Sequence, residues 1–222
     1  MLRSGHTAAS SSSPSSSSHV ARGEACFQRM DKCNAEVLAL LYGATVRQLL
    51  VDFDGNFDKV NGELYKMGND IGARLIDEFL IKSRVPPCQD FRDACEVMSK
   101  VALKMYLGVT GECVDWDDSA EGRKCRLVLP VNPLNDFVEL PIDLRRRQAD
   151  DNQQESKSSG PILYYSNILC GVIAGAMEQL RMNVAVEFES DVLLGDDMTA
   201  ISLELLEIVT DEIREDSDSD SD

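Results

Sequence analysis

The residue with the clearest potential for chemistry is Cys88, which lies in the segment SRVPPCQ between two helix-like stretches. Pro86 and Pro87 stop the first helix, because proline lacks the N–H donor and restricts the residue before it. Asp90 is a suitable N-cap for the second helix. Cys88 is therefore expected just outside a helix N-terminus, where free N–H groups and the helix dipole favour a thiolate.

Charged neighbours act in both directions on this thiol. Arg84 and Arg92 favour the thiolate, whereas Asp90 and Asp93 oppose it. A reactive thiol beside two apolar helix faces indicates a cysteine that carries a lipid. An inert surface cysteine is the alternative, since most free cysteines are structural or unreactive.

The other cysteines indicate a reducing compartment. The chain holds seven, an odd number, with no C-x-x-C pair and no apolar N-terminal stretch typical of a signal peptide. Reduced thiols are therefore expected rather than a disulfide framework. The cysteines lie at Cys26, Cys33, Cys88, Cys95, Cys113, Cys125 and Cys170.

Histidine is confined to the start of the chain. Both histidines, His6 and His19, lie in the serine-rich segment 1–30, which is expected to be disordered because it holds few apolar residues. The folded part is then expected to lack histidine. This excludes Ser-His-Asp and Cys-His catalysis and any histidine-based metal site.

Charge and length narrow the function further. A chain of 222 residues suits one domain, or at most two, and the net charge of −17 makes nucleic acid an unsuitable partner. A single domain is expected over 31–210, with a polar insertion at 143–160 and a disordered acidic tail at 211–222. Within that tail, Ser217 and Ser219 each precede an aspartate by three residues, which suits an acidophilic kinase; a solubilising tail is the alternative.

The expected order of helices and antiparallel strands predicts an α+β layer arrangement. Two glycine pairs, Gly68/Gly72 and Gly171/Gly175, have a four-residue spacing that indicates closely packed helices. Helices are expected at 31–52, 58–82, 90–107 and 163–181. Strands are expected at 113–116, 123–131, 183–194 and 199–209, with 132–141 as a short edge segment.

The helix after Cys88 carries small residues where a core helix often has leucine. Ala94 and Ala102 share its apolar side with Met98, and the preceding helix presents Leu75 and Phe79. Such a row could line a slot for an alkyl chain. Ordinary core packing between the two helices is the alternative.

Several long segments resemble a known family. LLYGATVRQLL, KMGNDIGARLIDEFL, VALKMYLGV, NPLNDFVELP and YSNILCGVIAGAMEQLRMNVAVEFESDVLLGD are similar, in the same order, to the Bet-three branch of TRAPP (transport protein particle) complex subunits. The resemblance covers about residues 34–209.

The resemblance implies a TRAPP-type α/β plait, in which a helical layer packs on a twisted four-stranded antiparallel sheet. It also implies pairing with other small TRAPP subunits through the helices. It implies a vesicle-tethering complex that acts as nucleotide exchange factor for a Rab GTPase in ER-to-Golgi and intra-Golgi transport. A single subunit is then not an enzyme, has no dissociable cofactor, and is cytoplasmic, peripheral to the cis-Golgi and endoplasmic reticulum. The family's palmitoylated cysteine, whose chain fills an internal tunnel, matches Cys88.

The chain departs from the family pattern in four places. The N-terminal extension and the 143–160 insertion are additions, Pro86-Pro87 stiffens the linker, and the last strand carries acids where relatives tend to carry bases. Two other functions remain open: a stand-alone homodimeric lipid or small-ligand binder, and an acyltransferase using Cys88. The second is disfavoured because no histidine is expected in the folded part to activate an acceptor.

Overall fold

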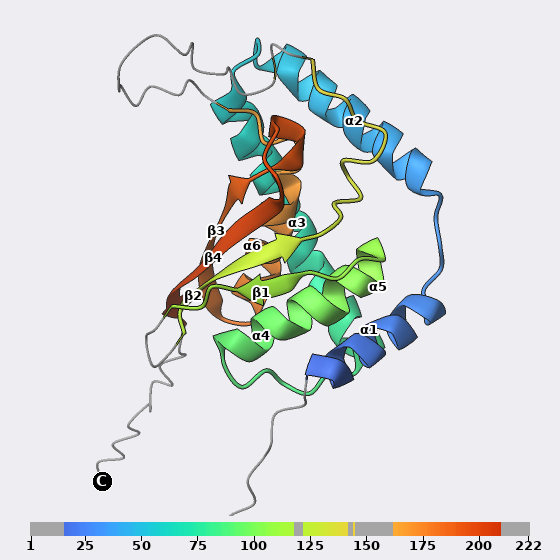
Figure 1. Cartoon of the computed structure of the whole chain (residues 1–222), viewed down its shortest axis with the longest axis vertical. Coiled ribbons are helices and arrows are strands. Elements are labelled where there is room, and N and C mark those ends of the chain that lie inside the picture. Colours follow the sequence, from blue (N-terminus) through green and yellow to red (C-terminus); the bar gives the residue numbers. More distant parts are fainter. Residues whose placement is uncertain (1–15, 118–121, 142–143, 145–161, 210–222) are drawn as a thin grey trace, which may run out of the picture.

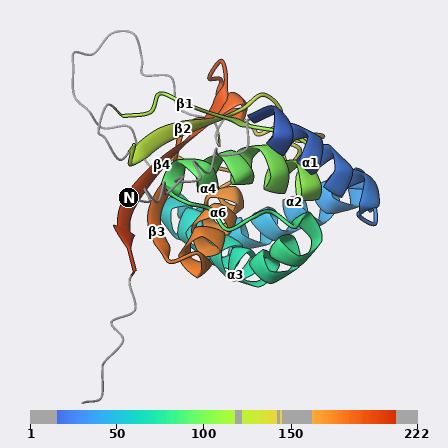
Figure 2. The same ribbon diagram turned by 90° about the horizontal axis from the view of Figure 1, so that it is seen from below.

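In the computed structural model, which describes residues 16–117, 122–141, 144 and 162–209, helices cover one face of an antiparallel sheet (Figure 1). The sheet order is β1-β2-β4-β3, and Figure 2 shows the helices gathered on one side of it. This confirms the predicted α+β layer arrangement. The strands are β1 (Glu112–Val114), β2 (Lys124–Leu129), β3 (Met182–Ser190) and β4 (Thr199–Ile208).

Alternation along β3 shows how the sequence fixes the two faces of the sheet. Val184, Val186 and Phe188 are buried against the helices, whereas Asn183 and Glu187 at the alternate positions are exposed, as a two-residue period requires.

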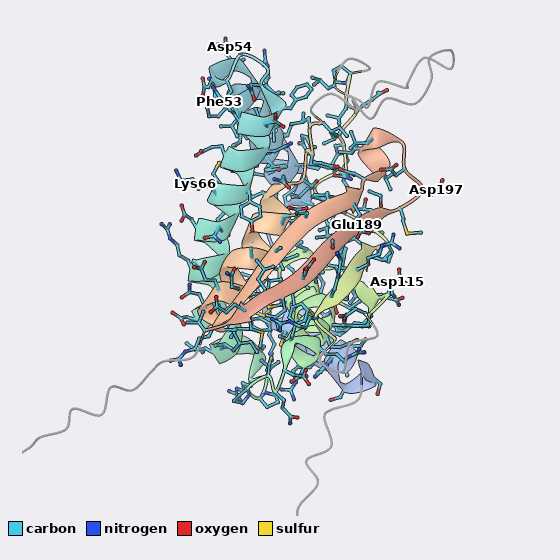
Figure 3. All side chains as sticks on the ribbon, turned by 90° about the vertical axis from the view of Figure 1, so that its left-hand side faces the viewer. Phe53, Asp54, Lys66, Asp115, Glu189 and Asp197 are labelled. Atoms are coloured by element: carbon cyan, nitrogen blue, oxygen red, sulfur yellow. The ribbon has the colours of Figure 1, made fainter. Side chains whose placement is uncertain are left out.

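The exposed face of the sheet carries charge pairs. Arg126 on β2 contacts Asp115 at 2.8 Å and Glu189 at 2.6 Å, and the two acids are labelled on this side of the molecule in Figure 3. Such exposed pairs contribute little to stability.

The helices of the layer correspond to the predicted helices, but some of their boundaries differ. The helix predicted from residue 163 begins at Ile168, and 132–141 forms turns rather than a strand. Within the described residues no helix is both long enough and apolar enough to cross a membrane. The helices are α1 (Ser16–Arg29), α2 (Ala35–Asp52), α3 (Phe57–Ser83), α4 (Phe91–Val97), the π-helical η1 (Met98–Ala102), α5 (Leu103–Leu107), α6 (Ile168–Gln179) and the 3₁₀ turn η3 (Val192–Leu194).

Helices α3 and α6 cross at the two glycine pairs, as their spacing predicted. A Cβ added at Gly72 would lie 2.1 Å from the carbonyl oxygen of Val172, and one added at Gly171 would lie 1.9 Å from that of Tyr65. Gly68 and Gly175 make equivalent backbone approaches. The two backbones are therefore in direct contact, which no side chain would allow.

Helix α1 corrects the expectation that 1–30 is disordered, because 16–29 form a helix that packs on η1, α5 and α3. Cys26 is buried, and Gly23 lies so close to η1 that an added Cβ would be 2.3 Å from the carbonyl oxygen of Lys100. The expectation that the folded part lacks histidine is also wrong, since His19 of α1 is buried. Neither of its ring nitrogens is hydrogen-bonded in the described part of the chain.

Helix α1 also holds the end of α3. Arg22 donates from Nη1 to the carbonyl oxygens of Arg84 at 2.8 Å and Ser83 at 3.3 Å. These carbonyls are among those that a helix leaves unpaired at its C-terminus. Helix α1 thus fixes the point where the chain leaves α3 toward Cys88.

Helix α2 is apolar on both sides. Its buried residues are Ala39, Tyr42 and Val46, whereas Leu40 and Leu41 on the other side are 75% and 66% exposed. Val37, which precedes Leu41 by one helical turn, also lies on the solvent side.

Other expectations lie outside the described residues. These are the segment 1–15, nearly all of the insertion 143–160, and the acidic tail 211–222 with Ser217 and Ser219.

Candidate functional site

The chain reaches Cys88 through a tightly defined linker between α3 and α4. Helix α3 ends at Arg84, whose left-handed conformation (φ 52°) turns the chain out of the helix. Pro86 and Pro87 then keep it extended. Asp90 caps α4 as predicted, since its side chain accepts a hydrogen bond from the Asp93 N–H at 2.8 Å. Cys88 is thereby held between two helix ends.

Beside Cys88 lies an apolar cavity of about 710 Å³. This volume is within the range of about 300–1,000 Å³ common for small-molecule sites. The cavity is enclosed by α3, the linker, the α4-η1-α5 segment and α6, and Cys88 is among its lining residues. All five residues proposed from the sequence to line a slot also border it: Leu75, Phe79, Ala94, Met98 and Ala102.

The helix that contains Ala102 is irregular, which the sequence did not reveal. Residues 98–102 are π-helical, with the Leu103 N–H bonded to the carbonyl oxygen of Met98. The Ser99 carbonyl instead accepts the Gly111 N–H at 3.0 Å. A contact outside the helix thus competes for a helix carbonyl, and π-bulges of this kind are frequent at functional sites.

Sequence reasoning missed the wall contributed by α6. Ile168, Val172, Ile173 and Ala176 line the cavity, as does Met182 of β3. The residues of α6 are apolar nearly all round the helix, so every one of its sides fits core packing. Ala176, a small residue that borders the cavity together with Ala94 and Ala102, was the available signal.

Burial reverses the expected electrostatics of Cys88. The half-buried thiol is desolvated, and the carboxylates of Asp93 and Asp90 add repulsion, so that the pKa of Cys88 rises to about 11. The expectation of a favoured thiolate is therefore wrong, because desolvation outweighs the helix N-terminus. Arg92 stacks on Trp116 instead, with its guanidinium carbon 4.1 Å from the ring centroid.

The raised pKa predicts how Cys88 reacts with pH. Because only the thiolate is nucleophilic, we expect alkylation of Cys88 by iodoacetamide to rise roughly tenfold per pH unit between pH 7 and pH 10. Peptide mapping by mass spectrometry after timed alkylation measures this rate. A rate that levels off below pH 9 would contradict the burial of the thiol.

The remaining site expectations concern metals and modification. Within the described residues no group of histidine, cysteine and acidic side chains is arranged to hold a metal ion. Ser217 and Ser219 lie outside those residues, so their phosphorylation stays a prediction.

Comparison with known proteins points in one direction. Residues 38–204 match the family model of the transport protein particle (TRAPP) component. The chain is 39% identical to the trafficking protein particle complex subunit BET3 of Saccharomyces cerevisiae over 87% of its own length and 92% of the relative's. It is 43% identical to the transport protein particle subunit bet3 of Schizosaccharomyces pombe, over 86% and 94%.

A solved structure is similar over the same region. It is the crystal structure of a trafficking protein particle complex subunit 3 from Naegleria fowleri covalently bound to palmitic acid. The TM-score is 0.70 at 40% identity, covering 82% of this chain and all of the other. By family match, extended identity and fold, the chain belongs to the TRAPP component family, with Bet3 and subunit 3 proteins among its relatives.

Proposed function

We propose that this protein is a subunit of a TRAPP-type vesicle-tethering complex whose Cys88 carries a palmitoyl thioester with the chain inside the cavity. The single observation that carries the lipid proposal is the apolar cavity of about 710 Å³ that Cys88 borders. Burying an alkyl chain is worth about 0.8 kcal/mol per CH₂, or roughly 12 kcal/mol for sixteen carbons as an upper bound. Inside the protein, such a chain serves as core rather than as a membrane anchor.

The raised pKa of Cys88 supports a stable thioester. The Cys88 thiolate, once formed, is a strong nucleophile that exchanges with an acyl thioester and releases the donor's thiolate. In the reverse direction, a buried thiolate of high pKa is a poor leaving group. The acidic neighbours that make Cys88 slow to react thus also make its thioester slow to cleave.

We propose that sister subunits dock on α2. Its outward side exposes large apolar residues that the described part of the chain does not cover, including Val37, Leu40, Leu41 and Val51. Contiguous exposed apolar surface of this kind marks protein interfaces. Pairing with other small TRAPP subunits through α2 would bury this exposed apolar surface.

The proposed cellular role follows from the family. In the assembled complex the protein would contribute to nucleotide exchange on a Rab GTPase in ER-to-Golgi and intra-Golgi transport. By itself it would be a structural subunit rather than an enzyme, peripheral to the cis-Golgi and endoplasmic reticulum. With a net charge of −17, attachment to anionic membrane depends on its neighbours rather than on its own charge.

A stand-alone homodimeric lipid or small-ligand binder is the second candidate, since an apolar cavity of this size suits a bound small molecule as well as a tethered chain. Affinity purification of the tagged full chain distinguishes the two. Stable recovery of other small subunits supports the TRAPP role. A lone homodimer with extractable ligand supports the alternative.

Intact mass spectrometry tests the lipid site. We expect the purified chain to carry a palmitoyl mass that neutral hydroxylamine removes and that is absent in Cys88→Ser. Cys33→Ser is the matched control, because Cys33 is exposed and does not border the cavity; it should acylate as the wild type does. An acyl mass that persists in Cys88→Ser would assign the lipid elsewhere.

A further inference from the structure

Three cysteines converge at the junction of the helical layer and the sheet, away from Cys88. Cys113 on β1 pairs in register with Leu127 on β2, so Cys113 and Cys125, two residues before Leu127, point to the same face of the sheet. That face is covered by α4, which contributes Cys95. Cys113 is half-buried, whereas Cys95 and Cys125 are 0% and 1% exposed.

Direct contacts connect the three side chains. The Cys113 thiol donates to the Cys95 carbonyl oxygen at 3.6 Å. The thiols of Cys95 and Cys125 and the Ser99 hydroxyl lie close enough to Cys113 to act on its pKa.

A lysine lies against the same group. The Lys100 ammonium donates to the Gly111 carbonyl oxygen at 2.7 Å and lies 3.9 Å from the Glu112 carboxylate. Lys100 directly follows Ser99 in the helix. Its hydrogen-bond partner Gly111 lies two residues before Cys113. The positive charge of Lys100 contributes to lowering the pKa of Cys113.

We propose that Cys113, Cys95 and Cys125 form a peroxide-reactive thiol site, in which Cys113 reacts first and Cys95 closes a disulfide with it. Cys113 is the half-buried member that a small oxidant can reach. Cys95 is the favoured partner because its backbone touches the Cys113 sulfur. Cys125 is diagonal to Cys113 across the strand pair, where Cα atoms are about 7–8 Å apart. This Cα separation is longer than a disulfide spans without backbone movement.

The surroundings shift the pKa values of Cys113 and Cys95 in opposite directions, which suits the two thiols to different roles. Hydrogen bonds from Cys125 and Cys95 lower the pKa of Cys113 well below its usual range, with Ser99 and Lys100 adding to the effect. The same contacts and burial raise the pKa of Cys95. A stabilised thiolate beside a neutral thiol is the arrangement found at redox-sensitive cysteines.

The chemistry balances with hydrogen peroxide as the oxidant. The Cys113 thiolate attacks one peroxide oxygen, the O–O bond breaks, and hydroxide leaves and is protonated to water, giving a sulfenic acid. The Cys95 sulfur then forms the S–S bond as the S–O bond breaks, and a second water leaves with the Cys95 proton. Two thiols are oxidised by two electrons and one peroxide is reduced.

The disulfide would link an edge strand to a wall of the cavity. Cys95 directly follows Ala94, which borders the cavity, and α4 also contributes Val97 to its lining. Oxidation would therefore cross-link β1 to the helix on which the lipid cavity depends.

Peroxide oxidation of the reduced full chain, followed by non-reducing digestion and mass mapping, tests the proposal. We expect a Cys95–Cys113 disulfide in the wild type and in Cys33→Ser, which removes an exposed thiol instead. In Cys113→Ser, the free Cys95 thiol should be lost at least about tenfold more slowly. Equally fast loss of the free Cys95 thiol in Cys113→Ser, or a wild-type disulfide from Cys113 to Cys125 instead of Cys95, would overturn the assignment.

A second measurement needs no variant. After neutral hydroxylamine has freed Cys88, brief iodoacetamide labelling of the wild-type chain at pH 6 should modify Cys113 at least about tenfold faster than Cys88, since only thiolates react. Equal labelling of the two cysteines would overturn the role of Cys113.

Discussion

Replacing Gly72 by alanine is expected to destabilise the protein by about 3 kcal/mol or more, although it adds a single methyl group. That methyl carbon would lie 2.1 Å from the Val172 carbonyl oxygen and 2.9 Å from the Ala176 amide nitrogen. Both are backbone atoms of α6, which cannot rotate away as a side chain could. Relief requires α3 and α6 to move apart along their whole crossing. Urea unfolding followed by circular dichroism measures the loss.

Gly62→Ala is the matched control, because Gly62 lies in the same helix but is exposed, with no atom within 4 Å of an added Cβ. Alanine there should stabilise the protein by about 0.5–1 kcal/mol, since glycine loses more backbone entropy in a helix. The same chemical change thus has opposite signs ten residues apart. Two variants of equal stability would show that α3 and α6 do not pack through their backbones.

Replacing Ala102 by leucine is expected to abolish acylation of Cys88 while leaving the fold intact. Ala102 borders the cavity from η1, so the larger side chain occupies space that the acyl chain needs. Each CH₂ forced into water costs about 0.8 kcal/mol, so excluding only two of them lowers occupancy by more than about tenfold. Filling a cavity commonly stabilises a protein by about 0.5–2 kcal/mol, so thermal unfolding of the unacylated variant should not fall.

Two controls separate lack of space from loss of the thiol. Ala35→Leu makes the same change at an exposed position on α2 that does not line the cavity, and it should acylate as the wild type does. In Ala102→Leu, Cys88 should still be alkylated by iodoacetamide at the wild-type rate. Normal acylation of Ala102→Leu would show that the lipid does not lie in this cavity.

The sequence was most informative where one residue type has one structural use. Gly68/Gly72 and Gly171/Gly175 predicted a close helix crossing because only glycine lets two backbones touch, and the structure confirms the crossing. Proline and aspartate marked the linker and the N-cap around Cys88 equally well. Alternation along β3 gave its buried face.

The sequence failed where composition concealed a pattern. Helix α1 follows a serine run, yet His19, Gly23 and Cys26 repeat at helical spacing on its buried side. The signal was present, but it lies on small or polar residues that carry little hydrophobic weight. A search for helical periodicity that gave small and polar residues the same weight as large apolar ones would have found this pattern.

Other features depend on contacts that no local pattern encodes. The π-helical turn at 98–102 arises from a backbone hydrogen bond with Gly111, beyond the end of α5. The raised pKa of Cys88 likewise depends on how deeply the linker sits between helices. Spacing along the chain predicted that Cys88 adjoins a helix end, but not how much water reaches it.

The grip of Arg22 on the last turn of α3 has a consequence for how the protein can be shortened. The family match begins at residue 38, so residue 38 is an obvious boundary for truncation or for trimming by a protease. A chain cut there would lose the guanidinium that binds the Ser83 and Arg84 carbonyls and uncover Val97, Val101 and Met105 beneath Cys26. The segment that bears Cys88 would then leave α3 without the hydrogen bonds from Arg22. The Cys88 site in such a minimal fragment would therefore differ from the site in the full-length molecule.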